Sequence, residues 1–126
     1  MIFTSPLKPQ LLKISNALKS HSTVVVCYCA LWCRTCVEFY EAFKNLSHER
    51  KELFLWVDIE DDPELLDDID VEDFPTVLIQ HNGENYFFGT ILPHIQHLNR
   101  LIDAQVKPKE LGPSDLNIII KNLLPS

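Results

Sequence analysis

The apolar positions of the chain form two kinds of segment, and the first kind predicts strands. Residues 23–29 (TVVVCYC) and 53–59 (LFLWVDI) are apolar runs rich in β-branched and aromatic side chains, with no polar alternation. Such runs are typical of strands that are buried on both faces of a sheet. Two further runs, 76–80 and 85–89, flank Asn82-Gly83, which is a strong signal for a β-hairpin.

The second kind of segment repeats apolar residues every three or four positions, which predicts amphipathic helices. These helices are expected at residues 6–20, 33–50, 93–106 and 114–124. The apolar positions of the first are Leu11, Leu12, Ile14, Ala17 and Leu18. A shorter helix is expected at Asp62-Pro63-Glu64, where a capping carboxylate precedes a proline at the first helical position.

The order of these segments predicts a mixed α/β fold. A helix between the strands at 23–29 and 53–59 implies a crossover between parallel strands, whereas the hairpin adds an antiparallel edge. A short additional strand is expected at residues 2–4. We therefore expect a mixed sheet with helices on both faces. The 126 residues fit one domain, and 46% hydrophobic residues are enough for a sizeable core.

Charge and hydropathy narrow the classes of partner. The net charge is −7 and no cluster of Lys or Arg is present, so we expect neither a nucleic acid nor a membrane as partner. The apolar runs are too short to span a bilayer. Residues 1–9 lack the apolar core and cleavage site of a secretory signal, and we therefore expect a cytoplasmic protein.

Candidate chemistry is concentrated at Cys33 and Cys36, which form a C-x-x-C motif between a buried strand and the next helix. Cys33 opens the helix, where free backbone N–H groups and the positive end of the helix dipole favour the thiolate. Arg34 adds a cation nearby. Cys36 follows one turn later and can attack a mixed disulfide formed on Cys33. The spacing predicts Cys33 as nucleophile and Cys36 as resolving cysteine.

A C-x-x-C pair is also compatible with half of a zinc site or with an inert pair of thiols. A zinc site needs a second pair of ligands at suitable spacing. Cys27 and Cys29 lie on a strand that must be buried, and His81, His94 and His97 show no such spacing. The strand–turn–helix context favours redox chemistry, and we expect no metal.

The chain resembles the thioredoxin family over residues 23–101. Three linked features carry the resemblance: Trp32 before the dithiol, the VDI strand end followed by a proline-initiated helix, and Phe74-Pro75-Thr76. The resemblance implies a thioredoxin fold and a disulfide reductase with no cofactor. It also implies that Pro75 follows a cis peptide bond, lies against the dithiol and helps to bind substrate polypeptide. The supporting residues that it implies are Trp32, Arg34, Thr35, Phe74, Pro75 and Thr76.

The sequence departs from that family near the dithiol. Arg34-Thr35 replaces the usual Gly-Pro, which predicts a weaker reductant. Cys27 stands where the family keeps a buried Asp, and Trp56 stands where it has a Lys, so the usual proton relay is missing or is replaced by the Cys27 thiol. Cys29 occupies a position that is usually aromatic. Cys27 and Cys29 are either small packing residues or auxiliary thiols.

Two further features concern partners. Ten carboxylates and no basic residue lie between Asp58 and Asp73. Such a run is typical of a solvated face, but here it would also rim the active site and favour basic partners. We expect a thioredoxin-like domain at residues 1–106 and a C-terminal extension at 107–126. The extension has an apolar stripe that packs on its own domain or forms a partner surface: Leu116, Ile119, Ile120, Leu123 and Leu124.

Two functions remain open. The first is a thiol–disulfide oxidoreductase that reduces or exchanges disulfides on cytoplasmic protein substrates and is restored by an electron-donating reductase, as part of cell redox homeostasis. The second is a binding or assembly module that recognises one specific partner at the acidic rim or the C-terminal helix, with little redox turnover. The intact dithiol favours the first, and we expect a monomer rather than a dimer.

Overall fold

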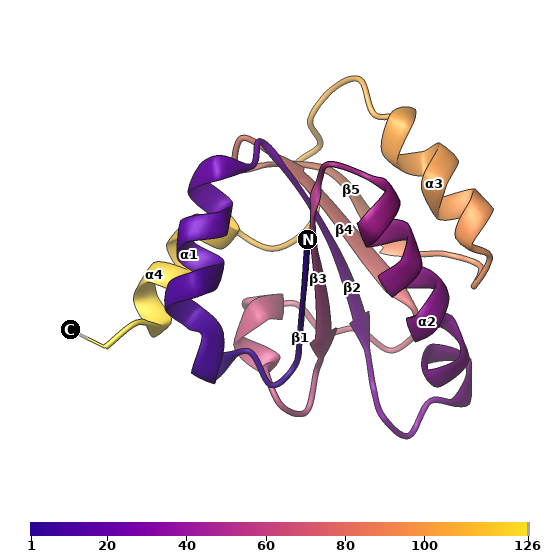
Figure 1. Ribbon diagram of the computed structural model, residues 1–126, viewed down its shortest axis with the longest axis horizontal. Helices are drawn as coiled ribbons and strands as arrows, with labels where there is room; N and C mark the ends of the chain where they lie inside the picture. Colours follow the sequence, from indigo (N-terminus) through magenta and orange to yellow (C-terminus); the bar gives the residue numbers. More distant parts are fainter. Residues whose placement is uncertain (126) are drawn as a thin grey trace.

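The computed structural model describes residues 1–125, and within them a five-stranded sheet lies between two layers of helices (Figure 1). The strands are β1 (Ile2–Thr4), β2 (Thr23–Cys29), β3 (Leu53–Asp58), β4 (Thr76–His81) and β5 (Glu84–Thr90). The α-helices are α1 (Leu11–Ser20), α2 (Arg34–Glu49), α3 (Ile95–Asp103) and α4 (Leu116–Leu123). Short 3-10 helices occur at η1 (Lys8–Gln10) and η2 (Pro63–Leu66). Ser126, the last residue of the expected extension, lies outside the described residues.

The sheet is mixed, as the sequence predicts. Its strand order is β1-β3-β2-β4-β5, with β3 parallel to both β1 and β2. The β4–β5 hairpin is antiparallel and continues the sheet from β2. Asn82 and Gly83 at its turn have φ angles of 51° and 83°, the left-handed values that a tight hairpin turn requires.

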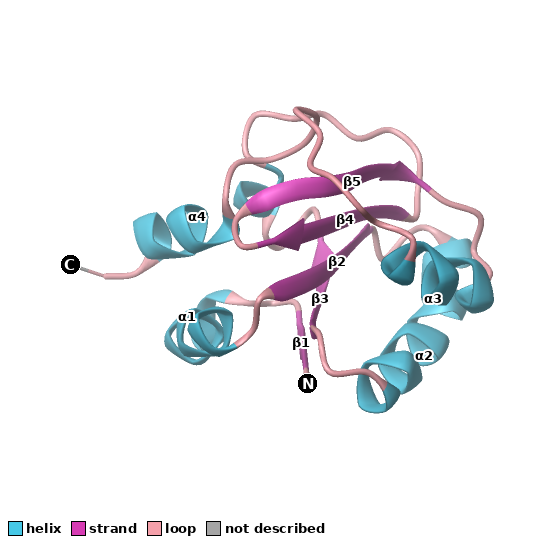
Figure 2. Cartoon of the chain, turned by 90° about the horizontal axis from the view of Figure 1, so that it is seen from above, coloured by secondary structure: helices cyan, strands magenta, loops and turns pink. Residues whose placement is uncertain are grey.

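Helices cover both faces of the sheet (Figure 2), and the sheet separates two hydrophobic cores. One core lies under α1 and α4, and the other lies under α2 and α3. Because side chains alternate along a strand, β2 contributes to both. Val24, Val26 and Tyr28 face the first core, while Val25, Cys27 and Cys29 face the second. Cys27 and Cys29 therefore lie on the face that α2 covers.

The C-terminal helix packs on its own domain. Leu116 and Ile120 are fully buried in the core under α1, and Ile119 is nearly so. The polar segment before the helix is fixed as well, because Gln80 donates to the carbonyl of Ser114 at 2.9 Å and accepts from the N–H of Leu116 at 3.1 Å. The apolar stripe of the C-terminal helix is thus largely buried against the chain's own core.

The first helix differs from the prediction. It begins at Leu11 rather than near Pro6, and residues 8–10 form a 3-10 turn. The reason is tertiary, because the carboxylate of Asp62 accepts hydrogen bonds from the N–H of Leu7 at 3.0 Å and from the hydroxyl of Ser5 at 2.5 Å. These bonds hold the segment as a loop. Leu12 lies within α1 but outside its buried face and is 67% exposed.

The same contacts correct the predicted helix cap at Asp62. Its side chain makes no capping hydrogen bond to η2, since it is buried beneath the N-terminal loop and bonds to that loop instead. Two other helices are shorter than expected. Helix α3 covers Ile95–Asp103 and α4 covers Leu116–Leu123.

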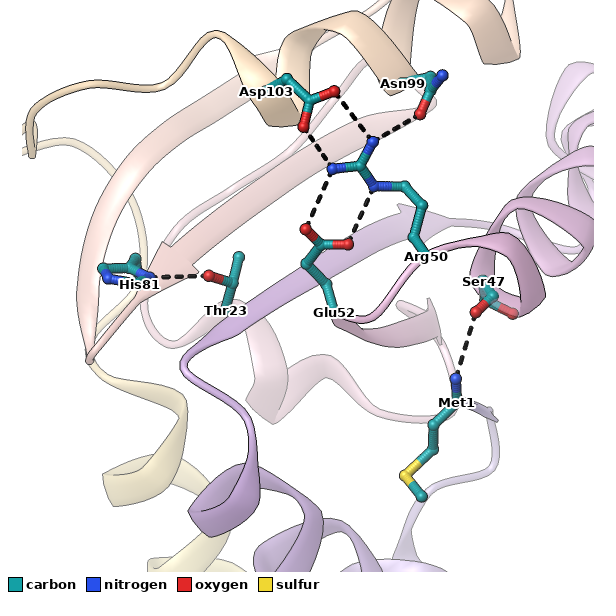
Figure 3. A network of polar contacts seen from close by, with 8 residues as sticks. All are labelled: Met1, Thr23, Ser47, Arg50, Glu52, His81, Asn99 and Asp103. Atoms are coloured by element: carbon teal, nitrogen blue, oxygen red, sulfur yellow. Dashed lines mark hydrogen bonds and ion pairs between the residues drawn. The ribbon is translucent and has the colours of Figure 1, made fainter.

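A cluster around Arg50 ties α2, β3 and α3 together (Figure 3). Its guanidinium donates two bonds to Glu52, at 3.0 and 3.1 Å, and two to Asp103, at 2.6 and 3.1 Å. A fifth bond reaches the side-chain oxygen of Asn99 at 2.8 Å. Although partial burial opposes ionisation of Glu52, its bonds to Arg50 hold its pKa below the usual 4.5. The hydrogen bond from Arg50 likewise lowers the pKa of Asp103.

We predict that Arg50→Ala lowers the free energy of unfolding at pH 7 by about 3 kcal/mol, because Glu52 keeps a buried charge without its partner. Both carboxyl pKa values are depressed in the folded state, so their contribution is present above the pKa of the unfolded chain and is lost as pH falls through the folded pKa. The deficit should therefore shrink below about pH 4.5. Urea unfolding of wild type and Arg50→Ala at several pH values measures this difference in the free energy of unfolding. Arg100→Ala, at an exposed position on the same helix as Asp103, should cost less than about 0.5 kcal/mol, and equal losses would contradict the prediction.

A second prediction concerns α4. Ile120→Ala should lower the free energy of unfolding by about 3 kcal/mol, because it leaves a cavity in the core under α1. Ile118 lies on the same helix but is 55% exposed, so Ile118→Ala is the matched control and should change stability by less than about 0.5 kcal/mol. Thermal and urea unfolding of the two variants give the comparison. A neutral Ile120→Ala would mean that α4 is not part of the folded unit.

Candidate active site

The loop between β2 and α2 carries the C-x-x-C motif and is held by backbone and carboxylate contacts. Cys33 is the N-cap of α2 in an extended conformation, and its N–H donates to the carbonyl of Ala30 at 3.0 Å. The Asp58 carboxylate at the end of β3 accepts from the N–H of Leu31 at 3.1 Å and from that of Glu60 at 2.8 Å. Asp58 therefore fixes two loops at the carboxyl ends of the parallel strands. Sequence reasoning grouped it only with the acidic run.

The sulfur atoms are not paired as the C-x-x-C motif predicts. Cys36 forms a disulfide with Cys29, with the two Cα atoms 5.7 Å apart, and Cys33 is a free, partly exposed thiol. The expected Cys33–Cys36 pair is thus not joined in this structure. The physical reason is that Cys29, the last residue of β2, faces the first turn of α2, where Cys36 points into the same core.

Cys27 is the remaining thiol and is completely buried. Its sulfur lies 3.7 Å from that of Cys29. Since the Cys29 sulfur carries no proton in the disulfide, the Cys27 thiol is the donor of this weak contact. Burial raises the pKa of the Cys27 thiol well above its usual value, which keeps it protonated and unreactive.

An aromatic contact between Trp32 and Phe74 lies next to Cys33 in the chain, and the segment that follows Phe74 is buried. The exposed Trp32 ring packs edge-on against Phe74, with ring centroids 5.6 Å apart. Its indole N–H donates to Glu60 at 2.6 Å. The Phe74–Pro75 peptide bond is cis, the isomer that the resemblance implies. The buried Thr76 donates its hydroxyl proton to the carbonyl of Asp73 at 2.6 Å.

The two residues between the cysteines face solvent. Arg34 and Thr35 are exposed, and the Arg34 guanidinium lies 3.2 Å from Glu38, one turn further along α2. The side chains of this pair are 92% and 68% exposed, so it contributes little to stability. The positive charge expected beside Cys33 is thus shared with a carboxylate.

A cavity of about 420 Å³ adjoins the disulfide. Both bonded cysteines line it, together with Tyr40, Trp56 and Asp58. Trp56 and Tyr40 pack edge-on with centroids 5.0 Å apart, so the place of the usual lysine partner is filled by aromatic surface. The wall next to the disulfide is largely apolar.

The acidic run serves two purposes. Asp58 and Asp62 are buried and bond to backbone N–H groups, which makes them structural. Glu60 contacts Trp32 directly. The remaining exposed carboxylates of the run are Asp61, Asp67, Asp68, Asp70, Glu72 and Asp73.

The comparison with known families settles the relationship. The thioredoxin family model matches residues 12–99, which is well over half of the chain. The chain belongs to the thioredoxin family. A thioredoxin domain with neighbouring cysteines and a disulfide supports thiol–disulfide oxidoreductase chemistry in general. No curated protein sequence matches the chain.

Solved thioredoxins share the fold. The Schistosoma mansoni thioredoxin pre-protein is 25% identical with a TM-score of 0.63, over 75% of this chain and 90% of that one. Oxidised thioredoxin O1 from Arabidopsis thaliana is 16% identical with a TM-score of 0.62, over 84% and 98% of the two chains. A mutant thioredoxin from Halobacterium salinarum is 18% identical with a TM-score of 0.64, over 76% and 85%. The last two show the fold alone.

None of the helices in residues 1–125 combines the length and apolar character needed to cross a membrane. Within the same range, no group of three or more His, Cys, Asp or Glu side chains is placed to hold a metal ion.

We predict that Asp58→Ala lowers the free energy of unfolding by about 2 kcal/mol, because two backbone N–H groups lose a charged acceptor. Asp61→Ala, at an exposed neighbour in the same acidic run, should cost less than about 0.5 kcal/mol. Urea unfolding of the two variants checks this. If they lose the same stability, the carboxylate of Asp58 does not anchor the loop.

Proposed function

We propose that this thioredoxin domain is a thiol–disulfide oxidoreductase that reduces or exchanges disulfides of protein substrates. The observation that carries the proposal is the position of Cys33. It is a free, partly exposed thiol at the N-terminus of a 16-residue helix, where the helix dipole stabilises a thiolate. The exposed Trp32 beside it offers a surface for substrate. A cytoplasmic location belongs to the same proposal.

The reaction begins with the protein in its reduced form. The Cys33 thiolate attacks one sulfur of a substrate disulfide, a mixed disulfide forms and the other substrate sulfur leaves as a thiolate. Cys36, one helical turn away, then attacks the Cys33 sulfur and releases the second substrate thiol. Two electrons pass to the substrate and the protein is left oxidised. A reductase dithiol returns the two electrons by the reverse exchange.

The surface around Cys33 favours a restricted set of substrates. Leu31, Trp32 and Val37 are 75%, 66% and 56% exposed, and Glu60 lies against the Trp32 ring. An apolar patch with a carboxylate at its border fits extended, basic polypeptides better than acidic ones. In this proposal the partly exposed Phe74 forms the other side of the substrate site, and the buried Pro75 and Thr76 support it from beneath.

The same patch supports a second candidate function, a binding or assembly module for one specific partner. Large apolar side chains exposed together are typical of interaction surfaces. The free Cys33 favours chemistry, and the two functions differ in whether that thiol is required.

The test is dithiothreitol-coupled reduction of insulin, compared between variants. Cys33→Ser should reduce the rate to that of dithiothreitol alone, because the attacking sulfur is lost. Cys27→Ala changes a buried cysteine outside the proposed mechanism and should keep wild-type activity. Cys36→Ser should accumulate mixed disulfides that non-reducing gels separate, and these should be absent from the Cys33→Ser/Cys36→Ser double variant. Full activity of Cys33→Ser would exclude the proposed reaction, and a partner bound equally well without Cys33 would favour the binding module.

A further inference from the structure

The proposed reaction uses two of the four cysteines and leaves Cys29 without a role. Yet Cys29 is the residue to which Cys36 is bonded. Both are 1% exposed, so this disulfide lies beneath the surface, while Cys33 stays free and partly exposed beside it. The pairing describes an oxidised site whose nucleophile is still a thiol.

We propose that Cys29 is a third redox-active thiol, which takes Cys36 from Cys33 and stores the disulfide of the oxidised protein in the core. The proposal rests on the proposed function for the step that first joins Cys33 to Cys36. It adds a residue to the active site and a second oxidised form to the reaction.

The exchange needs no external oxidant. The Cys29 thiol attacks the Cys36 sulfur of the Cys33–Cys36 disulfide, and the proton that Cys29 gives up ends, in the net reaction, on the sulfur of Cys33. The Cys29–Cys36 bond forms as the Cys33–Cys36 bond breaks, and Cys33 leaves as a thiolate that takes up a proton. One disulfide is present before and after, so no electrons enter or leave the protein.

The geometry places Cys36 within reach of both partners. Cys33 is the N-cap of α2 and Cys36 lies three residues later, and side chains at this spacing are neighbours on a helix. On the other side, the Cα atoms of Cys36 and Cys29 are 5.7 Å apart, within the usual range for a disulfide. Cys36 is the one sulfur shared between the two pairings.

The surroundings favour the buried pairing. Cys33 leaves towards solvent, because it is the partly exposed cysteine of the three. The sulfur atoms of Cys29 and Cys36 border the cavity of about 420 Å³, which gives Cys29 room to move without unpacking the sheet. Cys27 does not line this cavity, and burial raises the pKa of its thiol.

The exchange has a functional consequence. A protein dithiol cannot reach a disulfide that is 1% exposed on both sides, so the oxidised protein transfers its disulfide only through Cys33. While Cys36 is held by Cys29, Cys33 can still attack a substrate, but no thiol is available to resolve the mixed disulfide. Oxidation would therefore convert a turnover site into one that retains its substrate covalently.

The test maps the disulfide of the full-length wild-type chain after oxidation with stoichiometric diamide. Free thiols are blocked with N-ethylmaleimide under native conditions, and the protein is digested with trypsin and chymotrypsin. Arg34 separates Cys33 from Cys36, and Tyr28 and Trp32 separate Cys27, Cys29 and Cys33 from one another, so mass spectrometry assigns every linkage. We expect a Cys29–Cys36 linkage and a maleimide label on Cys33.

Variants give the matched comparison. Oxidised Cys29→Ala should contain a Cys33–Cys36 linkage and lose the Cys33 label, whereas oxidised Cys27→Ala should keep the wild-type linkage and label. A Cys33–Cys36 linkage in the oxidised wild type, with no label on Cys33, would overturn the inference. Insulin reduction by reduced wild type and by Cys29→Ala reports separately on the proposed function. If both are active while the map shows only Cys33–Cys36, this inference alone fails, and if wild type is inactive, the proposed function fails whatever the map shows.

Discussion

Burial of β2 on both faces is the constraint on which the site depends. Because the strand lies between β3 and β4 and helices cover both of its faces, successive side chains must enter two different cores. That alternation sends Val24, Val26 and Tyr28 to one side and Cys27 and Cys29 to the other. The turn after Cys29 then brings α2 over the second face, with Cys36 pointing inward and Cys33 at the rim. The contact of three buried sulfur atoms follows from strand geometry.

Two buried carboxylates complete the frame at the end of β3. Asp58 holds the loop that carries Trp32 and Cys33, and Asp62 holds the loop before α1. Each accepts a hydrogen bond from one backbone N–H far away in the sequence, Leu31 for Asp58 and Leu7 for Asp62, so the acidic segment connects the N-terminal loop with the active-site loop. Both oxygens of Asp58 accept hydrogen bonds from backbone N–H groups, which offsets the cost of burying its charge. Asp62 accepts both of its bonds on one oxygen, and its other oxygen is buried without a partner.

Local patterns predicted those parts of the fold that local forces decide. The bounds of β2, the hairpin turn at Asn82-Gly83 and the start of α2 at the C-x-x-C motif agree with the structure. The start of α1 and the use of Asp62 depend on contacts between residues more than fifty positions apart, which periodicity does not contain. The partner of Cys36 is a case of the same kind, because the motif predicts a neighbour in sequence, while the sheet brings in Cys29 from the strand.

Cys27 and Trp56 replace the family's usual proton relay, and this replacement gives a physical reason for a disulfide between Cys36 and Cys29. A resolving cysteine in an apolar core must lose a proton before it attacks, and a buried thiolate without a charged or hydrogen-bonding partner is costly. Here Trp56 and the protonated Cys27 surround the sulfur atoms with groups that supply little compensation. A disulfide is neutral and carries no such cost. An apolar wall therefore favours Cys36 in bonded form over Cys36 as a waiting thiolate. In the proposed exchange Cys29 supplies the sulfur for that bond, and the sulfur released is that of Cys33, which is the partly exposed one.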